Sequence, residues 1–254
     1  MPEPRTFKLT IAYDGTELSG WQIQPGRSTV QGQLERVIAK LVGQRVGVVG
    51  SGRTDAGVHA LAQVASCTLP HWSGTEQQLG RAINTGLPDS ILVTEVETAP
   101  EDFHAIRDSK AKRYRYQIQN GGQRNPFDHR FWFRLRRPVN VDAVAVASQV
   151  VVGCQDFASF QATGAVRKTT VRTVTACEVI ELPVGPWGEP RLAIEVEADG
   201  FLYNMVRNIV GTVLEVGSGK RSVQWVEDVI KARNRDLAGP TAPACGLFLK
   251  WVRY

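Results

Sequence analysis

A glycine-rich segment, Gly50–His59, places the strongest constraint on this chain. It follows an apolar run that predicts a short buried strand near residues 46–50, and it precedes a second strand-like run at 61–69. Its glycines let the backbone turn sharply and approach a ligand closely. The segment holds one cation, Arg53, and one carboxylate, Asp55. An acid displayed on such a loop is a candidate reactive group.

Three other functions of this segment are disfavoured by the residues at its key positions. A nucleotide-binding phosphate loop needs Lys followed by Ser or Thr where the chain has Val58 and His59. A dinucleotide fingerprint needs glycine at the position of Asp55. Ser51, Asp55 and His59 would align as a hydrolase triad only on a helix, which the glycines disfavour. Taken alone, an aspartate that hydrogen-bonds its own turn remains the ordinary alternative.

Hydrophobic periodicity predicts an α+β fold. Alternation over Thr6–Tyr13 indicates a half-buried strand, and Ser28–Gln31 resembles a capping box that opens a helix. Further helices are predicted near 75–85, 142–152, 203–216 and 223–234, and further strands near 90–98, 112–119, 171–182, 191–198 and 246–253. Strands and helices mix in both parts of the chain, which predicts two α/β domains, residues 1–106 and 107–254, whose sheets could join.

Composition narrows the class of protein. The chain has 254 residues, 43% of them hydrophobic, which is enough to bury a core. No apolar run approaches the roughly 20 residues that span a bilayer, and the N-terminus lacks the apolar segment of a signal peptide. The cysteines and histidines are dispersed, which argues against a metal site and favours the reducing cytoplasm. They are Cys67, Cys154, Cys177, Cys245, His59, His71, His104 and His129.

The positive charge is concentrated in the second part of the chain. The net charge is +5, and the excess of basic over acidic residues lies entirely after residue 100. Aromatic residues are interleaved with this charge, which favours a polyanion partner over a set of solvated faces. Composition does not separate RNA from DNA. The basic clusters are Lys110, Lys112, Arg113 and Arg115; Arg134, Arg136 and Arg137; Arg167, Lys168 and Arg172; and Lys231, Arg233 and Arg235.

The segment Ser51–His59 resembles the signature of the tRNA pseudouridine synthase A family. Further segments agree with that family in order and spacing: Tyr13–Gly15 with Gly20–Gln22, Phe103–Ala105 with Arg113–Tyr116, Asp156–Phe160, Met205–Gly211, and Gly246 with Leu247. The resemblance implies a pseudouridine synthase fold, with two mostly antiparallel halves joined around a central catalytic cleft. It also implies isomerisation of uridine at nucleotides 38 to 40 of the tRNA anticodon stem-loop.

The resemblance assigns roles to five residues. Asp55 is similar to the family's nucleophile, which attacks either C6 of the base or C1′ of the sugar. Arg53 and Arg207 would hold the carboxylate ionised and bind the substrate, because a nearby cation lowers an aspartate pKa. Tyr114 would stack on the extruded uracil, and Leu247 would close the pocket. The reaction requires no cofactor, and the family implies a cytoplasmic homodimer that binds tRNA and neither DNA nor a membrane.

One position departs from the family pattern. The family often has arginine after the motif Phe103–Ala105, whereas this chain has Ile106 followed by Arg107. If residue 107 follows strand alternation, its side chain points to the opposite face. Two rival functions also remain: an RNA-binding or chaperone protein without catalysis, and a pseudouridine synthase that acts on another RNA.

Overall fold

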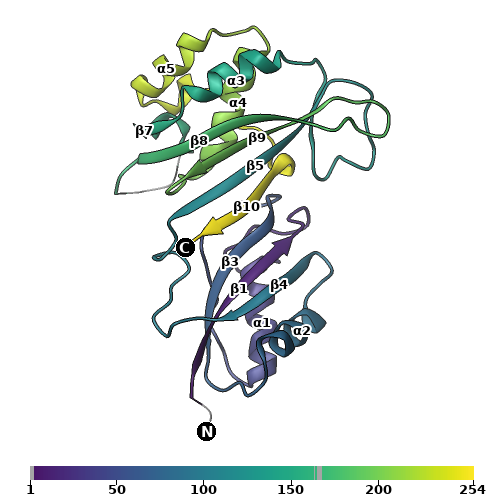
Figure 1. Cartoon of the computed structure of the whole chain (residues 1–254), viewed down its shortest axis with the longest axis vertical. Coiled ribbons are helices and arrows are strands. Elements are labelled where there is room, and N and C mark those ends of the chain that lie inside the picture. The colour runs from purple at the N-terminus through teal and green to yellow at the C-terminus, as the bar shows by residue number, and fades with distance from the viewer. Residues whose placement is uncertain (1–2, 163, 165–167) are drawn as a thin grey trace. The chain divides into compact units, whose positions relative to one another are not determined.

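The structure, a computed structural model, describes residues 3–162, 164 and 168–254. The chain forms two compact units (Figure 1). Unit 1 runs up to Lys110 and also includes Phe248–Tyr254, and unit 2 is Ala111–Leu247. The chain therefore leaves unit 1, builds all of unit 2 and then returns. The predicted domain division between residues 106 and 107 stays a prediction.

Unit 1 is built on a sheet with the strand order β4-β1-β3-β10, in which β2 also pairs with β3. Strand β3 is antiparallel to β1 and β2 and parallel to β10, and β4 is antiparallel to β1. The strands are β1 (Arg5–Tyr13), β2 (Val49–Gly50), β3 (His59–Leu69), β4 (Ile91–Thr98) and β10 (Leu247–Arg253).

Two helices cover one face of the unit 1 sheet (Figure 1). They are α1 (Val30–Val42) and α2 (Glu76–Gly86). Alternate β1 residues such as Phe7 and Leu9 are fully buried, as are Leu34 of α1 and Leu79 of α2. The period of two along the strand and of about 3.6 along the helices places these side chains in one core.

Unit 2 repeats this arrangement of layers with a sheet in the order β5-β9-β8-β7, antiparallel throughout. A short strand, β6, pairs in parallel with the end of β5. The elements are β5 (Ala111–Asn120), β6 (Phe133–Leu135), α3 (Val141–Gln149), β7 (Gly153–Asp156), β8 (Val171–Leu182), β9 (Arg191–Ala198), α4 (Met205–Gly217) and α5 (Val223–Ala232). Short 3₁₀ turns occur at Ala158–Phe160, Arg235–Leu237 and Ala244–Gly246.

Helices α3, α4 and α5 pack together above the unit 2 sheet in Figure 1. Helix α4 is buried over most of its length, because its sequence is apolar on nearly every side. Among the described residues, no helix combines the length and the apolar character needed to cross a membrane.

The mixed α/β architecture with mostly antiparallel strands confirms the predicted fold class, but two local predictions were wrong. Helix α1 begins one residue later than the capping box implied: Thr29 is the N-cap and accepts the Gly32 N–H, while Gln31 Nε2 donates to Glu35. The strand near 46–50 is only Val49–Gly50.

Candidate active site

Asp55 lies on the loop that joins β2 to β3 in unit 1. The loop turns back at this residue, because the Asp55 carbonyl accepts the Val58 N–H at 3.1 Å. Val58 is buried while the Asp55 side chain is half-buried. The carboxylate therefore stands on the accessible side of a loop whose far end is anchored in the core.

A buried glutamine fixes the first part of this loop. Gln63 of β3 is fully buried, and its Oε1 accepts the Ser51 hydroxyl at 2.7 Å. Its Nε2 donates to the Gly52 carbonyl at 2.8 Å. The Ser51 N–H also donates to the Val64 carbonyl at 2.7 Å. These bonds satisfy polar groups that would otherwise be buried without partners, so the loop is held in one conformation.

The residue before Asp55 is held from both its side chain and its backbone. The Thr54 hydroxyl lies 2.8 Å from the Tyr13 hydroxyl, in a buried hydrogen bond. The Thr54 carbonyl accepts the Trp21 N–H at 3.0 Å. Burial raises the pKa of Tyr13 to about 12, so its hydroxyl stays protonated near neutral pH. Tyr13 and Trp21 belong to motifs far from Asp55 in sequence.

Two glycines allow the neighbouring backbone to touch the loop. A Cβ on Gly20 would lie 2.6 Å from the Thr54 carbonyl oxygen, and Gly20 has a φ of +87°. A Cβ on Gly15 would lie 2.0 Å from the Val58 carbonyl oxygen. Any other residue at either position would push the loop away. The remote glycine motifs thus serve the packing of the aspartate loop.

His59, at the end of the loop, is fully buried. The Gly15 N–H donates to its Nδ1 at 3.0 Å, and its ring stacks on Phe248 with the centroids 4.6 Å apart. This environment makes His59 a packing residue of unit 1.

Arg53 is exposed, and its guanidinium makes no ion pair within the described part of the chain. That a nearby cation, Arg53 or Arg207, holds Asp55 ionised stays a prediction. The Arg53 side chain is exposed to solvent.

In unit 2, Tyr114 occupies the buried face of β5. Its ring is 7% exposed and meets the Phe201 ring edge-on, with the centroids 4.9 Å apart at 81°. Edge-on aromatic pairs of this kind are a favoured arrangement and restrain both rings. Tyr114 is thus set in a fixed orientation by an aromatic neighbour that sequence reasoning missed.

Tyr116, two residues along the same face, is locked more tightly. It is fully buried, its hydroxyl donates to the Pro243 carbonyl at 2.7 Å, and burial raises its pKa far above the ordinary range. A Cβ on Gly246 would lie 2.9 Å from its ring. Tyr116 thus joins β5 to the segment that leads into Leu247.

Arg207 lies in the first turn of α4, and its guanidinium is hydrogen-bonded to two neutral groups. Its Nε donates to the Ala242 carbonyl at 2.7 Å and its Nη1 to Asn204 Oδ1 at 2.9 Å. Burial raises the pKa of both Tyr116 and Cys245, and the charge of Arg207 opposes the rise at both. The guanidinium therefore lies near Tyr116 and Cys245.

Leu247 is 5% exposed and begins β10, directly after the turn that packs against Tyr116. The structure thus groups the predicted substrate residues Tyr114, Arg207 and Leu247 around Tyr116 within unit 2. Asp55 and Arg53 belong to unit 1.

Two arginines of the basic cluster at residues 110–115 are paired with carboxylates inside the sheet. Glu195 of β9 is 1% exposed and accepts Arg113 Nε and Arg115 Nε, each at 2.6 Å. Arg113 also pairs with Glu178 and Glu197. Lys112, on the opposite face, is buried, which lowers its pKa. Arg113 and Arg115 are therefore paired within unit 2, while Lys110 is exposed. That the basic clusters together bind a polyanion stays a prediction.

Some side chains of the other basic clusters are also paired within the protein, whereas others are exposed. Arg233 pairs with Asp156, and Lys231 with Glu227 on its own helix. Arg235 is bound to Gly239, Asn208 and Thr241. Arg167 lies outside the described residues. Arg136 and Arg137 are exposed, and the described residues include no carboxylate partner for them.

The departure at Ile106 has a local explanation. Residues 105–108 form a turn, so strand alternation does not apply there. Ile106 is 53% exposed, and Arg107 pairs with Asp108 at 2.7 Å and donates to the Asp102 carbonyl. Arg107 therefore stabilises its own turn.

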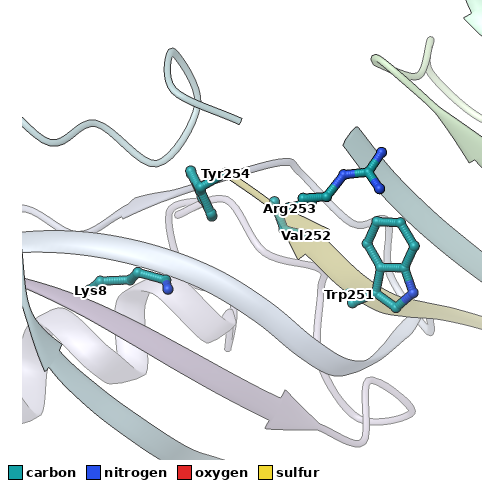
Figure 2. A pocket seen from close by; sticks show the side chains of 5 residues that line it. All are labelled: Lys8, Trp251, Val252, Arg253 and Tyr254. Carbon is teal, nitrogen blue, oxygen red and sulfur yellow. The ribbon is translucent and has the colours of Figure 1, made fainter. Parts of the chain in front are cut away.

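A hollow in unit 1 lies along the end of β10 (Figure 2). Trp251 and Arg253 project to the same side of the strand, with the guanidinium 5.6 Å from the indole centroid. Lys8 lies 5.6 Å from the ring centroid of Tyr254 and pairs with Glu97 at 2.7 Å. The hollow has a volume of about 430 Å³ and is lined by Lys8, Trp251, Val252, Arg253 and Tyr254. None of the predicted site residues lines it.

Within the described ranges, no group of three or more His, Cys, Asp or Glu residues could hold a metal ion. The polar groups around Asp55 instead hold the loop itself, through Gln63, Tyr13 and Thr54.

Comparison with known proteins agrees with this geometry. A family model described as tRNA pseudouridine synthase matches residues 9–107 and 147–254. The chain therefore belongs to the tRNA pseudouridine synthase family, a class of isomerases.

Individual relatives carry a more specific name, tRNA pseudouridine synthase A. The protein of that name from Limosilactobacillus fermentum is 43% identical over 251 residues, covering 98% of this chain and 95% of the relative. The one from Geobacillus kaustophilus is 44% identical over 249 residues, covering 98% and 94%. The one from Lacticaseibacillus casei is 42% identical over 249 residues, covering 98% and 99%.

Proposed function

We propose that this chain isomerises uridine to pseudouridine at nucleotides 38 to 40 of the tRNA anticodon stem-loop, with Asp55 as the nucleophile. The observation that carries the proposal is the loop around Asp55, which lies within the matched family region and is fixed by bonds from Gln63 and Tyr13. Relatives that cover nearly all of the chain are named for this activity.

The reaction needs little beyond a placed carboxylate. The glycosidic bond between C1′ and N1 breaks, the uracil turns within the pocket, and C1′ bonds to C5. C5 loses its proton and N1 takes up one proton, either the same one or one from solvent, so that the product is an isomer of the substrate. No electron, phosphate or acyl group is transferred, so the reaction balances without a cofactor. Asp55 attacks either C6 of the base or C1′ of the sugar. A rigid loop supports both routes, because it holds the carboxylate at one position.

The proposal assigns substrate-binding roles to four further residues. The Tyr114 ring, fixed by Phe201, stacks on the extruded uracil, and its hydroxyl assists removal of the C5 proton. Arg207, held by Ala242 and Asn204, and the exposed Arg53 bind the flipped nucleotide and its phosphates. Leu247 closes the pocket. Flipping the base out costs a few kcal/mol of free energy. Contacts of the protein with the RNA phosphate backbone offset this cost.

The setting proposed for this activity is a cytoplasmic homodimer, with the tRNA lying across both subunits. Recognition rests on RNA shape, because the target nucleotides occur in many tRNAs of different sequence.

Tritium release from tRNA labelled at uridine C5 tests the proposal. Asp55→Asn keeps the shape of the side chain and removes the nucleophile, so we expect unchanged tRNA binding and less than about a few per cent of wild-type release. Asp89→Asn, at an exposed aspartate of the same unit, is the matched control and retains full activity. Substantial release by Asp55→Asn would reject the nucleophile.

Mapping the modified nucleotides separates the remaining alternatives. A protein that only binds RNA releases no tritium from any substrate. A synthase with another target releases tritium, but pseudouridine then forms outside nucleotides 38 to 40. Comparing total tRNA from cells with and without the protein identifies these positions directly.

A further inference from the structure

A second cavity, of about 460 Å³, lies in unit 2 beside the residues around Tyr116. It is lined by the end of β5, the following loop, β6 and the segment before Leu247: Gln119, Arg124, Asn125, Asp128, His129, Trp132, Phe133, Arg134, Pro243 and Cys245. Most of this lining falls between residues 108 and 146, which the family model does not match.

Two aromatic rings form the apolar part of the wall. Trp132 has one face covered by the Arg191 guanidinium, 4.6 Å from the ring centroid. Phe133 meets the Tyr116 ring edge-on, with the centroids 6.3 Å apart at 77°. Both rings are therefore held in place, and fixed aromatic rings bind nucleobases by stacking.

The charge on the wall is positive. Arg124 is exposed, and the described residues provide no partner for its side chain. Arg134 donates from Nη2 to the Gly122 carbonyl at 2.8 Å, but its buried Nε has no acceptor among the described residues. A buried donor without an acceptor is costly, which a bound anion would relieve.

Asp128, the one carboxylate among the lining residues, is already paired with other side chains. Asp128 pairs with Arg191 and accepts Asn125 Nδ2 at 2.9 Å. Asn125 also donates to Glu189, which is 1% exposed and pairs with Arg191 at 3.0 Å. Gln119 Nε2 donates to two loop carbonyls. These buried bonds make the cavity preformed, so binding costs little ordering of the loop.

The cavity adjoins the proposed substrate residues. Pro243 lines it and accepts the Tyr116 hydroxyl, and Cys245 lines it near Arg207. An RNA strand that reaches Tyr114 and Arg207 therefore has a second, basic and aromatic hollow next to it.

We propose that this cavity binds one nucleotide of the substrate RNA other than the uridine that is isomerised. The base lies against Trp132 and Phe133, and the phosphate is bound by Arg124 and Arg134. The proposal rests on the proposed function, and it identifies the contact that helps to hold the RNA while the target base is flipped out.

Equilibrium binding of tRNA tests the phosphate contact. Arg124→Ala should weaken binding about tenfold and reduce the dependence of log Kd on log salt by about one unit. Arg136→Ala removes the same charge from a nearby exposed residue outside the cavity and is the matched control, with less than about a twofold effect. Equal losses in the two variants would show general surface attraction and overturn the proposal.

The stacking contact has its own pair of variants. Trp132→Ala should weaken tRNA binding about fivefold or more, whereas Trp132→Phe keeps an aromatic ring and should stay within about twofold of wild type. Thermal melting checks the fold of both proteins, and Arg124→Ala keeps the test valid if Trp132→Ala unfolds. Equal affinity of folded Trp132→Ala and wild type would overturn the stacking contact.

Alkylation of Cys245 reports occupancy of the cavity, with the exposed Cys154 as an internal reference. Bound tRNA should slow iodoacetamide modification of Cys245 relative to Cys154, and Arg124→Ala should reduce this protection at equal tRNA concentration. Protection by free uridine 5′-monophosphate together with unchanged tRNA affinity of Arg124→Ala would assign the cavity to a free nucleotide and overturn the proposal.

Two results separate this inference from the proposed function. The tRNA affinity of Arg124→Ala should fall about tenfold whether or not Asp55 is the nucleophile, because affinity is measured without turnover. Asp55→Asn should bind as tightly as wild type and not turn over. If Asp55→Asn isomerises uridine and Arg124→Ala still binds tRNA about tenfold more weakly, Asp55 is rejected as the nucleophile. The proposal of a second nucleotide site is then unaffected.

Discussion

At the scale of single residues, the position of Asp55 depends on groups that the sequence keeps far apart. Gln63 holds the start of the loop, and Tyr13 and Trp21 hold Thr54 next to the carboxylate. The sequence predicted the loop and its acid from local glycines. It could not predict these partners, because a buried side-chain bond between distant segments leaves no periodic signal.

The close approach of Gly20 to the loop gives a direct prediction. Gly20→Ala adds a Cβ 2.6 Å from the Thr54 carbonyl at a positive φ, so we expect a loss of roughly 2–4 kcal/mol in unfolding free energy and reduced kcat. Gly26→Ala is the matched control, because Gly26 also has a positive φ but nothing within 4 Å of its Cβ. Urea unfolding of both variants measures the difference, and equal losses would show that the contact with Thr54 is unimportant.

The buried Tyr13 hydroxyl predicts a pH dependence. Its pKa is raised to about 12 from an ordinary value of 10, so the folded state binds the proton more tightly than the unfolded state. This contribution to stability is complete below about pH 10 and is lost as the pH rises through about 12. We expect the wild type to lose on the order of 2–3 kcal/mol more than Tyr13→Phe across that window. Parallel stability curves for the two proteins would contradict the assignment.

At the scale of elements, β5 shows what periodicity can and cannot reveal. The alternation of Tyr114 and Tyr116 with Arg113 and Arg115 predicted a strand with two different faces, and the structure has it. Periodicity could not show that Glu195 lies beside both arginines, because register between distant strands is set by the fold. Strands β6 and β7 were missed because three or four residues are too few to show alternation.

The carboxylate between the two arginines predicts a stability change. Glu195→Gln removes a buried charge that accepts from Arg113 and Arg115, so we expect a loss of about 3–5 kcal/mol. Glu178→Gln removes an exposed partner of Arg113 and should cost at most about 1 kcal/mol. Urea unfolding compares them, and similar costs for the two substitutions would argue against a special role for the buried carboxylate.

At the scale of the whole molecule, the chain completes unit 1 only with its return. Residues 248–254 bring β10 alongside β3, place Phe248 on His59, and let the Tyr254 hydroxyl donate to the Ala105 carbonyl at 2.9 Å. The sequence predicted a strand near 246–253 correctly. That this strand belongs to unit 1 depends on its pairing with β3, which is distant in sequence and cannot be predicted from a local pattern.

Removing that strand should affect unit 1 selectively. A protein ending at Leu247 loses the β10 pairing and the Phe248 ring, whose burial alone is worth about 2–3 kcal/mol. We expect limited proteolysis to cleave unit 1 first while unit 2 stays resistant. Tyr254→Phe, which loses one hydrogen bond, is the mild control and should cost about 1 kcal/mol. Unchanged resistance of unit 1 in the shortened protein would contradict this dependence.

The return of the chain also orders events on the ribosome. Residues 111–247 are translated between the two parts of unit 1. A nascent protein therefore carries its complete aspartate loop while the rest of unit 1 and all of unit 2, residues 111–247, are made, before Phe248 can reach His59. During elongation the end of the loop lacks the contact of Phe248 with His59, so the loop reaches its final packing only after unit 2 has been synthesised.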